Sequence, residues 1–268
     1  LFSMAARSAF HDEELFAIQG WAPADEYQTL AAHLAGMDIT AAVRGIDPAE
    51  DETPPTLVRY PKWARTIKGL FDILDTFPGY REIDLSAFFM VFLPIFAAML
   101  IGDGGYGLVF ILPVVLMRRK MFAKLGREKT NLLLLFGITA FIWGVLNANF
   151  FGVTPETLAR AGGFLTPDDE VDWQRFYDAS GGWAVAGNFM IDIAPFWRED
   201  GDASRELLIQ ISFLIGCTHL VLAHLRQALA LWPDKRALAQ AGWAIVLVSV
   251  LGIIWLMFFE SESVPVPA

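Results

Sequence analysis

Residues 85–117 read LSAFFMVFLPIFAAMLIGDGGYGLVFILPVVLM, an almost unbroken apolar stretch that is interrupted by Gly102-Asp103-Gly104-Gly105. As one helix it would be about 50 Å long, whereas the hydrocarbon core of a bilayer is about 30 Å thick. The stretch is therefore either one strongly overlong membrane span or two short spans that meet near Asp103. Both alternatives predict a membrane-embedded chain.

The composition of the whole chain supports the same class. Hydrophobic residues make up 55% of it, 22 of its 268 residues are Phe, and its mean hydropathy is +0.44, all above what a soluble domain usually shows. Further apolar runs of the length that crosses a bilayer lie at 131–152, 206–229 and 237–259. We therefore predict a mainly α fold, in which a polytopic helical membrane domain over 85–268 is preceded by the tail of an α/β cytoplasmic domain.

The distribution of Lys and Arg favours two spans within 85–117. Short loops rich in these residues stay cytoplasmic, and only two crossings place the basic pre-membrane segment on the same side as both later basic loops. The loop 153–205 is instead acidic on balance and carries Trp173, Trp183, Phe196 and Trp197, which favour a membrane interface. We predict five spans, at about 85–102, 104–118, 131–152, 206–229 and 237–259, with an external loop 153–205 and a cytoplasmic amino-terminal part. The basic residues are Arg59, Lys62, Arg65 and Lys68, then Arg118, Arg119, Lys120, Lys124, Arg127 and Lys129, then Arg226, Lys235 and Arg236.

Two segments precede the membrane domain. Residues 1–46 are predicted to end a cytoplasmic α/β domain, with a helix that starts after Pro23 and stops near Gly36. Residues 47–84 are predicted to be an acidic, Pro-containing linker followed by a basic amphipathic helix over 62–75. That helix fits the lipid headgroup layer and a soluble domain equally well. Because the chain opens on Leu1 and stops soon after an apolar run, we expect it to be part of a longer protein.

Several functional classes are disfavoured. The formal net charge of −10 argues against a nucleic-acid partner, which would require a basic face. The lone Cys217 lies in an apolar run and offers neither a disulfide nor a metal cluster. The sequence shows no phosphate-binding loop, catalytic triad or metal-ligand spacing, so we expect no active site, metal or cofactor in this chain.

Asp103 is the polar residue most costly to place in a bilayer. One interpretation makes it part of an ion pathway. The other, which we favour, makes it a cap for the following helix at a glycine-rich turn, where Gly102, Gly104, Gly105 and Gly107 let backbones approach closely.

Four further polar residues lie in the apolar runs. Asn147 and Asn149 are more often hydrogen-bonded between helices than bound to ions. His219 and His224 suit a proton relay because histidine titrates near neutral pH, but a hydrogen bond to a neighbouring helix is the interpretation we favour.

The order of these segments resembles subunit I, or a, of V/A-type rotary ATPases. The most specific match is Gly102-Asp103-Gly104-Gly105-Tyr106-Gly107, which is similar to the family's Gly-Asp-x-Gly-Tyr-Gly between its first two spans. Three other stretches are similar: 16–23 with its Gly20-Trp21-Ala22-Pro23 turn, 53–84, and 141–152, where Asn147, Ala148 and Asn149 depart from the family's Tyr, Gly and Ser. Residues 214–220 are also family-like.

The resemblance implies a membrane-embedded stator subunit. Such a subunit faces a rotor ring of proteolipid subunits, contacts peripheral stalk subunits through its cytoplasmic arm, and supports H⁺ or Na⁺ translocation. In this family the essential arginine lies on later spans. No Arg or Lys lies mid-span in 85–259, so we expect that arginine to lie outside this chain. An arginine beside a ring carboxylate would favour its ionised form. A standalone transporter or channel, and a non-transporting scaffold, are the alternatives. The resemblance, with no targeting signal seen, leads us to expect a prokaryotic plasma membrane.

Overall fold

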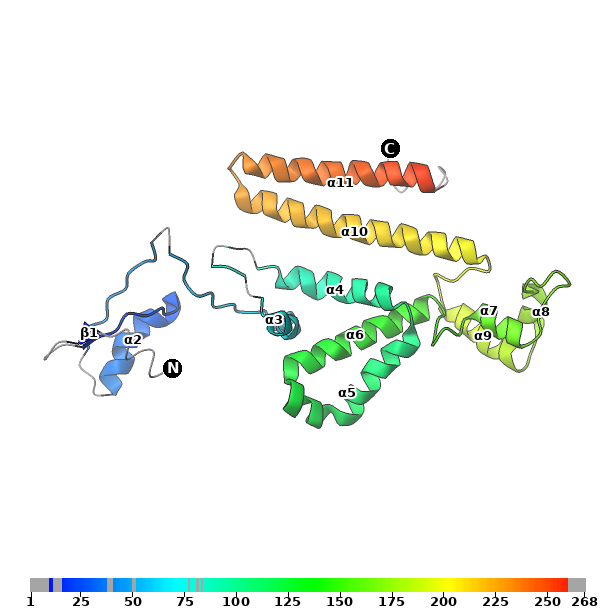
Figure 1. Ribbon diagram of the computed structural model, residues 1–268, viewed down its shortest axis with the longest axis horizontal. Helices are drawn as coiled ribbons and strands as arrows, with labels where there is room; N and C mark the ends of the chain where they lie inside the picture. The colour runs from blue at the N-terminus through cyan, green and yellow to red at the C-terminus, as the bar shows by residue number, and fades with distance from the viewer. Residues whose placement is uncertain are drawn as a thin grey trace. The chain divides into compact units, whose positions relative to one another are not determined.

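The computed structural model describes residues 10–11, 16–37, 41–49, 52–76, 78–80, 82 and 84–259. It divides into two compact units, Leu1–Ser86 and Ala87–Ala268. Helices make up most of the described residues (Figure 1), so the prediction of a mainly α chain is confirmed. Phe77, Arg81 and Ile83, from the family-like stretch before the first span, lie outside the described residues.

The first unit begins with a short antiparallel strand pair, β1 (Phe10–His11) and β2 (Phe16–Ala17). The helix α2 (Ala24–Gly36) follows directly after Pro23 and ends at Gly36, as predicted. Its first turn carries Asp25 and Glu26, whose charge suits the positive end of a helix dipole. Arg59 donates two hydrogen bonds to the Asp25 carboxylate, at 2.6 and 3.0 Å, and so holds the connector against the start of α2.

The basic amphipathic helix predicted over 62–75 is shorter in the structure. A 3₁₀ turn, η1 (Arg65–Ile67), leads into α3 (Lys68–Leu74), which ends where Asp75 takes a left-handed conformation at φ 50°. Ile67 and Phe71 are buried, whereas Trp63 is 55% exposed. Only part of the predicted apolar face is therefore covered within this unit.

The apolar stretch that opens the membrane domain is two helices rather than one. The first, α4 (Ser86–Ile101), ends at Gly102, whose φ of +66° takes the chain out of the helix. The second, α5 (Gly104–Leu125), starts immediately after Asp103. It runs past the predicted boundary at 118, with non-helical backbone angles at Met117 that mark a kink.

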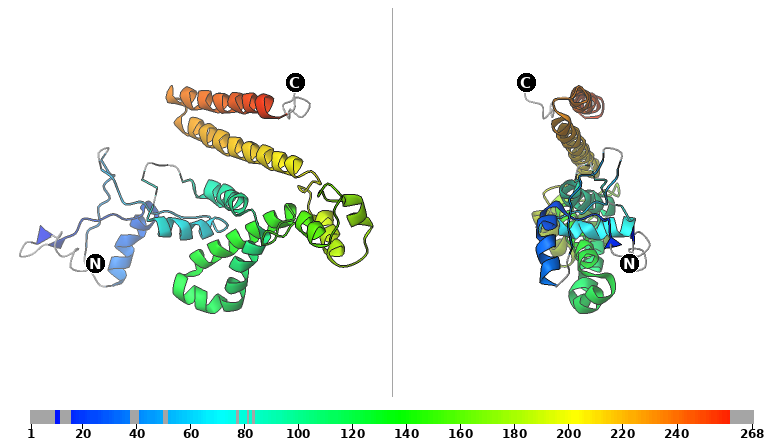
Figure 2. Two further views of the ribbon diagram at one scale, coloured as in Figure 1. Left: turned by 45° about the vertical axis from the view of Figure 1, so that its right-hand side comes forward. Right: turned by 90° about the vertical axis from the view of Figure 1, so that its left-hand side faces the viewer.

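Helix α6 (Arg127–Leu146) returns beside α5 as an antiparallel hairpin, visible in both Figure 1 and Figure 2. The helix stops before the predicted limit at Gly152. Ala148, Phe151 and Gly152 have φ values of 52°, 56° and 74°, and this left-handed backbone cannot continue a right-handed helix. Residues 147–153 therefore form a turn.

A second antiparallel hairpin is formed by α10 (Gly201–Leu231) and α11 (Arg236–Phe258) (Figures 1 and 2). Helix α10 starts before the predicted position 206 because the Asp200 side chain caps it by accepting a hydrogen bond from the Asp202 N–H. Among the described residues, three helices are long and apolar enough to cross a bilayer: α6, α10 and α11. The shorter α4, of 16 residues, is also apolar.

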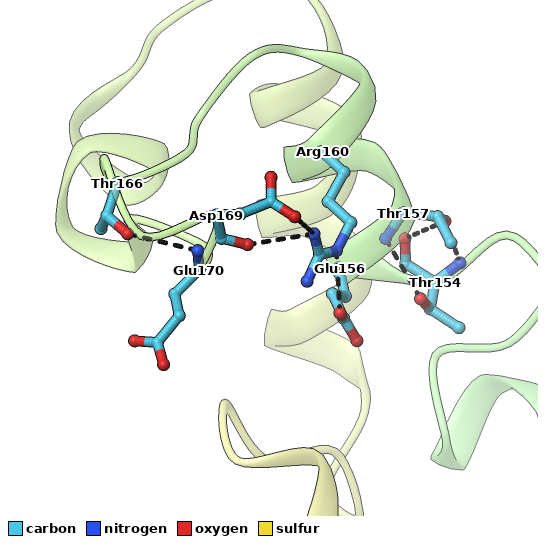
Figure 3. Close-up of polar contacts among 7 residues, drawn as sticks. All are labelled: Thr154, Glu156, Thr157, Arg160, Thr166, Asp169 and Glu170. Atoms are coloured by element: carbon cyan, nitrogen blue, oxygen red, sulfur yellow. Dashed lines mark hydrogen bonds and ion pairs between the residues drawn. The ribbon is translucent and has the colours of Figure 1, made fainter.

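The loop after α6 folds into a small helical cap, a shape that the sequence did not predict. Its helices are α7 (Pro155–Ala161), α8 (Trp173–Asp178) and α9 (Trp183–Ile193). Phe176 is fully buried at the centre of the cap, against Leu158 and Ala184. Figure 3 shows the polar side chains at the start of the cap, in which Thr154 and Thr157 cap α7 reciprocally and Arg160 bridges Glu156 and Asp169.

Candidate functional site: the turn around Asp103

Asp103 is the first residue of the candidate site, and it caps α5. Its Oδ1 accepts hydrogen bonds from the Gly105 N–H at 2.7 Å and from the Tyr106 N–H at 3.2 Å. These are amides that a helix leaves without a partner in its first turn. Asp103 is only 5% exposed, so the cap replaces solvation that the carboxylate has lost.

The same carboxylate also binds the turn that follows α6. Oδ1 accepts a hydrogen bond from the Phe151 N–H and Oδ2 one from the Gly152 N–H, both at 2.9 Å. One side chain thus receives four backbone N–H groups from two segments nearly 50 residues apart. We call residues 102–106 and 149–152, held together in this way, the Asp103 latch.

Asn149 adds two hydrogen bonds to the latch. Its side-chain Nδ2 donates to the Gly102 carbonyl at 2.9 Å, and its own carbonyl accepts from the Gly104 N–H at 2.9 Å. Asn149 therefore joins the α6 turn to the α4–α5 junction, which is the packing role favoured from the sequence over ion binding.

The glycines of the motif let α5 and α6 approach closely. A Cβ on Gly144 would collide with the backbone of Gly104, and one on Gly107 with the backbone of Phe141. Tyr106, by contrast, is exposed and packs edge-on against Phe151 at 5.8 Å between ring centroids. The Gly102–Gly107 motif therefore combines a carboxylate cap with a backbone-to-backbone helix contact.

Asn147 lies next to the latch in sequence but has different contacts. Its Nδ2 donates to the Trp143 carbonyl of its own helix at 2.7 Å, and its buried Oδ1 has no protein partner among the described residues. Asn147 lines a cavity of about 170 Å³ between the end of α6, the cap and the start of α10, together with Trp173, Phe196 and Arg198.

The two histidines contact other helices. His219 of α10 packs edge-on against Phe92 and Phe96 of α4, at 4.4 and 5.7 Å between ring centroids. His224 Nδ1 lies 2.7 Å from Gln240 Oε1 of α11. His224 thus lies within hydrogen-bond distance of a neighbouring helix, whereas the buried Nδ1 of His219 has no hydrogen-bond partner among the described residues. The structure brings neither histidine to the latch.

The cap beside the latch holds one strongly perturbed group. Burial raises the pKa of Tyr177, and the hydrogen bond from its hydroxyl to Glu199 Oε1, at 2.9 Å, raises that pKa further. Tyr177 therefore stays protonated at physiological pH and acts as a fixed donor. No group of three or more potential metal ligands occurs among the residues described by the structure.

The sequence did not predict that Phe151, Gly152 and Gly144 take part in the site. Phe151 and Gly152 enter through their backbone N–H groups, which a side-chain search does not detect. The available signal was the aromatic-aromatic-glycine run at 150–152, in the family-like stretch 141–152. Gln240, the partner of His224, was also missed because it lies at the start of an apolar run.

Taken together, the fold and the latch define a polytopic helical membrane protein with a glycine-rich first hairpin. Curated proteins similar to the chain belong to one kind of complex. It is 27% identical over 228 residues to V-type ATP synthase subunit I 1 of Treponema pallidum, covering 82% of this chain and 32% of the relative. It is 25% identical over 261 residues to V-type ATP synthase subunit I of Borreliella burgdorferi, covering 94% and 38%.

The similarity extends to eukaryotes. The V-type proton ATPase subunit a, vacuolar isoform, of Saccharomyces cerevisiae is 24% identical over 232 residues, covering 80% of this chain and 26% of the relative. No family model matches the chain. These relatives confirm the resemblance to subunit I/a of V/A-type ATPases, and the chain spans about a third of the length of the first two.

Proposed function

We propose that this chain is part of the membrane-embedded stator subunit of a rotary V/A-type ATPase. The observation that carries the proposal is the similarity to subunit I over 82–94% of the chain, which includes the Gly102–Gly107 motif. In this role the membrane domain faces a rotor ring of proteolipid subunits and supports H⁺ or Na⁺ translocation. The amino-terminal part links it to the peripheral stalks.

The relative directions of α4 and α10 support separate crossings by α4 and α5, as the five-span topology requires. Phe88 lies beneath the Arg226 guanidinium, at 5.1 Å from its ring centroid, while Phe92 contacts His219. Between these two contacts the residue number rises from 88 to 92 in α4 and falls from 226 to 219 in α10, so the two helices are antiparallel. Alternating crossings by α4, α5, α6, α10 and α11 require this direction for α4, whereas a single crossing by α4 and α5 together would reverse the topology before α6.

The latch supports a structural role for Asp103 in the stator. Its carboxylate is already held by four N–H groups, and an ion path would need those bonds to break. The latch instead fixes the ends of α4, α5 and α6 at one level. It thereby provides a rigid support for the later spans, on which the family's essential arginine lies.

Affinity purification of the full-length protein from native membranes tests the assignment. Recovery of a proteolipid ring, peripheral stalk subunits and the soluble ATPase subunits is the expected result. Recovery of a small oligomer of this protein alone would contradict it and favour a standalone transporter or channel. The protein could instead be recovered with ATPase subunits while ion pumping is the same with and without it. This result would favour a scaffold.

A further inference from the structure

The tip of the α5–α6 hairpin carries a dense group of cations. We define this basic tip as residues 118–129; its cations are Arg118, Arg119, Lys120, Lys124, Arg127 and Lys129. Glu128 is the one acidic residue within it. None of the six cations takes part in an ion pair among the described residues, although ion pairs elsewhere include Arg160 with Glu156 and Arg236 with Asp234. The charge of the basic tip is therefore not neutralised by the protein described here.

The length of the hairpin places the backbone of the basic tip just below the lipid headgroups, within reach of them for long side chains. Arg118 follows Asp103 by about 15 residues, which is a rise of about 22 Å in a helix. Lys129 precedes the end of α6 by about 17 residues, a rise of about 26 Å. Both distances are shorter than the hydrocarbon core of about 30 Å. With the Asp103 end at the opposite surface, next to the charged cap, these cations reach the phosphate layer by extending their side chains.

Two of the cations are held in place by an aromatic ring. The Arg118 guanidinium lies 5.0 Å from the centroid of Phe122, and that of Arg127 lies 5.8 Å from the same ring. These arginines come from the two different helices of the hairpin. A guanidinium stacked on a ring still presents its N–H groups to a phosphate, which it binds in a bidentate manner. The basic tip thus offers two pre-positioned phosphate ligands within a wider field of positive charge.

We propose that the basic tip binds the headgroup phosphates of anionic phospholipids in the adjacent leaflet. Charge complementarity and the short apolar length of both helices favour lipid over an acidic protein surface, because lipid phosphates lie at the depth that the cations reach. Binding there anchors the hairpin against sliding along the membrane normal. The proposal depends on membrane insertion of the hairpin and not on the rotary role.

The full-length protein, reconstituted in vesicles of phosphatidylcholine, tests the proposal with spin-labelled phosphatidylglycerol and spin-labelled phosphatidylcholine as probes. Electron paramagnetic resonance measures the fraction of each probe that the protein immobilises. We expect a preference of about fivefold for phosphatidylglycerol, as about one net cation contact would give. It should disappear in about 1 M salt, where the Debye length falls to about 3 Å.

Two matched variants separate the basic tip from general positive charge. The first replaces the two exposed arginines that stack on Phe122, by Arg118→Gln and Arg127→Gln. The control replaces two cations at the start of α11, by Lys235→Gln and Arg236→Gln, where Arg236 is already paired with Asp234. We expect the lipid preference to fall toward one in the tip variant and to persist in the control.

Three results would overturn the proposal. The tip variant could keep the full preference for phosphatidylglycerol, or the control could lose it equally, which would indicate bulk electrostatics. Alternatively, the tip variant could keep the lipid preference but no longer co-purify with a protein subunit, which would identify an acidic protein surface as the partner.

Discussion

At the scale of single residues, Asp103 has an unusually large number of donors for one side chain. An ionised carboxylate accepts hydrogen bonds more strongly than a neutral group does, and here all four donors are backbone amides in a setting that is only 5% exposed. Loss of the carboxylate would leave these amides without a partner where water has little access. The latch is therefore sensitive to a single substitution at Asp103.

We expect Asp103→Ala to destabilise the full-length protein by at least about 3 kcal/mol, because each buried amide left unsatisfied costs about 1–3 kcal/mol. SDS-induced unfolding in mixed micelles, followed by helical circular dichroism, measures this loss. Asp172→Ala is the matched control: Asp172 caps α8 through a single amide, that of Arg175, and should cost about 1 kcal/mol. Equal losses in the two variants would argue against the latch.

Asp103→Asn separates the structural role from the ion-path role. The amide keeps the size of the side chain but replaces one acceptor oxygen by a donor, so we expect reduced assembly of the complex. In the complexes that do assemble, coupled pumping should remain normal. Normal assembly combined with altered pumping would instead assign Asp103 to the ion path, and the two readouts are made on the same membranes.

The His224–Gln240 pair links α10 to α11, and a double-mutant cycle measures its strength. Hydrogen bonds between membrane helices contribute about 0.6 kcal/mol on average and up to about 1.7 kcal/mol. We expect a coupling free energy in this range between His224→Phe and Gln240→Leu, measured by the same unfolding assay. A coupling of zero together with a loss of pumping in His224→Phe alone would favour a proton relay.

At the scale of helices, the α5–α6 hairpin depends on backbone contact at its glycines. Membrane helices lack a hydrophobic driving force for association and gain stability from close packing, which small residues permit. Gly104 and Gly144 meet at the end of the hairpin nearest the latch, where the Gly104 N–H also donates to Asn149. Packing and hydrogen bonding at this point therefore depend on the same short separation.

Gly144→Ala should destabilise the hairpin by about 1–3 kcal/mol, because its methyl group would overlap the Gly104 backbone. Gly252→Ala on α11 is the matched control, since nothing lies within 4 Å of the added methyl group there. The control should be neutral or stabilising by up to about 1 kcal/mol through helix propensity. Unfolding midpoints of the two variants decide the comparison, and a neutral Gly144→Ala would show that the helices are further apart.

At the scale of the whole molecule, the arrangement of helices relative to the membrane is the main property left to measure. The basic segments lie on one side only if α4 and α5 cross separately. In this topology Lys62 and Lys120 face one side of the membrane, and Asp168 faces the other side. All three are exposed and lie outside the apolar segments.

Cysteine labelling tests this topology. In a Cys217→Ser background, we expect single cysteines at Lys62 and Lys120 to react with a membrane-impermeant maleimide only from the cytoplasmic side. A cysteine at Asp168 should react only from the outside. Reaction of the Lys62 and Asp168 positions from the same side would establish a single crossing by 85–117 and would require the helix directions to be reassigned.

The sequence by itself determined the class of the protein and the limits of a few helices. Apolar length and glycine and proline positions act locally, so α2 and α11 could be located closely from them. The resemblance to subunit I followed from short motifs and is confirmed by the relatives. A capping turn was the favoured interpretation of Asp103 and its glycines because a carboxylate before a helix has a local physical preference.

The tertiary structure decided what this turn binds. The partners of Asp103 are backbone amides of Phe151 and Gly152, and backbone donors carry no signature in the side-chain pattern. The end of α6 at Leu146 was likewise set by left-handed residues that serve the latch. The shape of the cap depends on Phe176 packing between helices that are individually too short to be stable alone. Contacts between segments distant in sequence fixed these features, and no local pattern contains them.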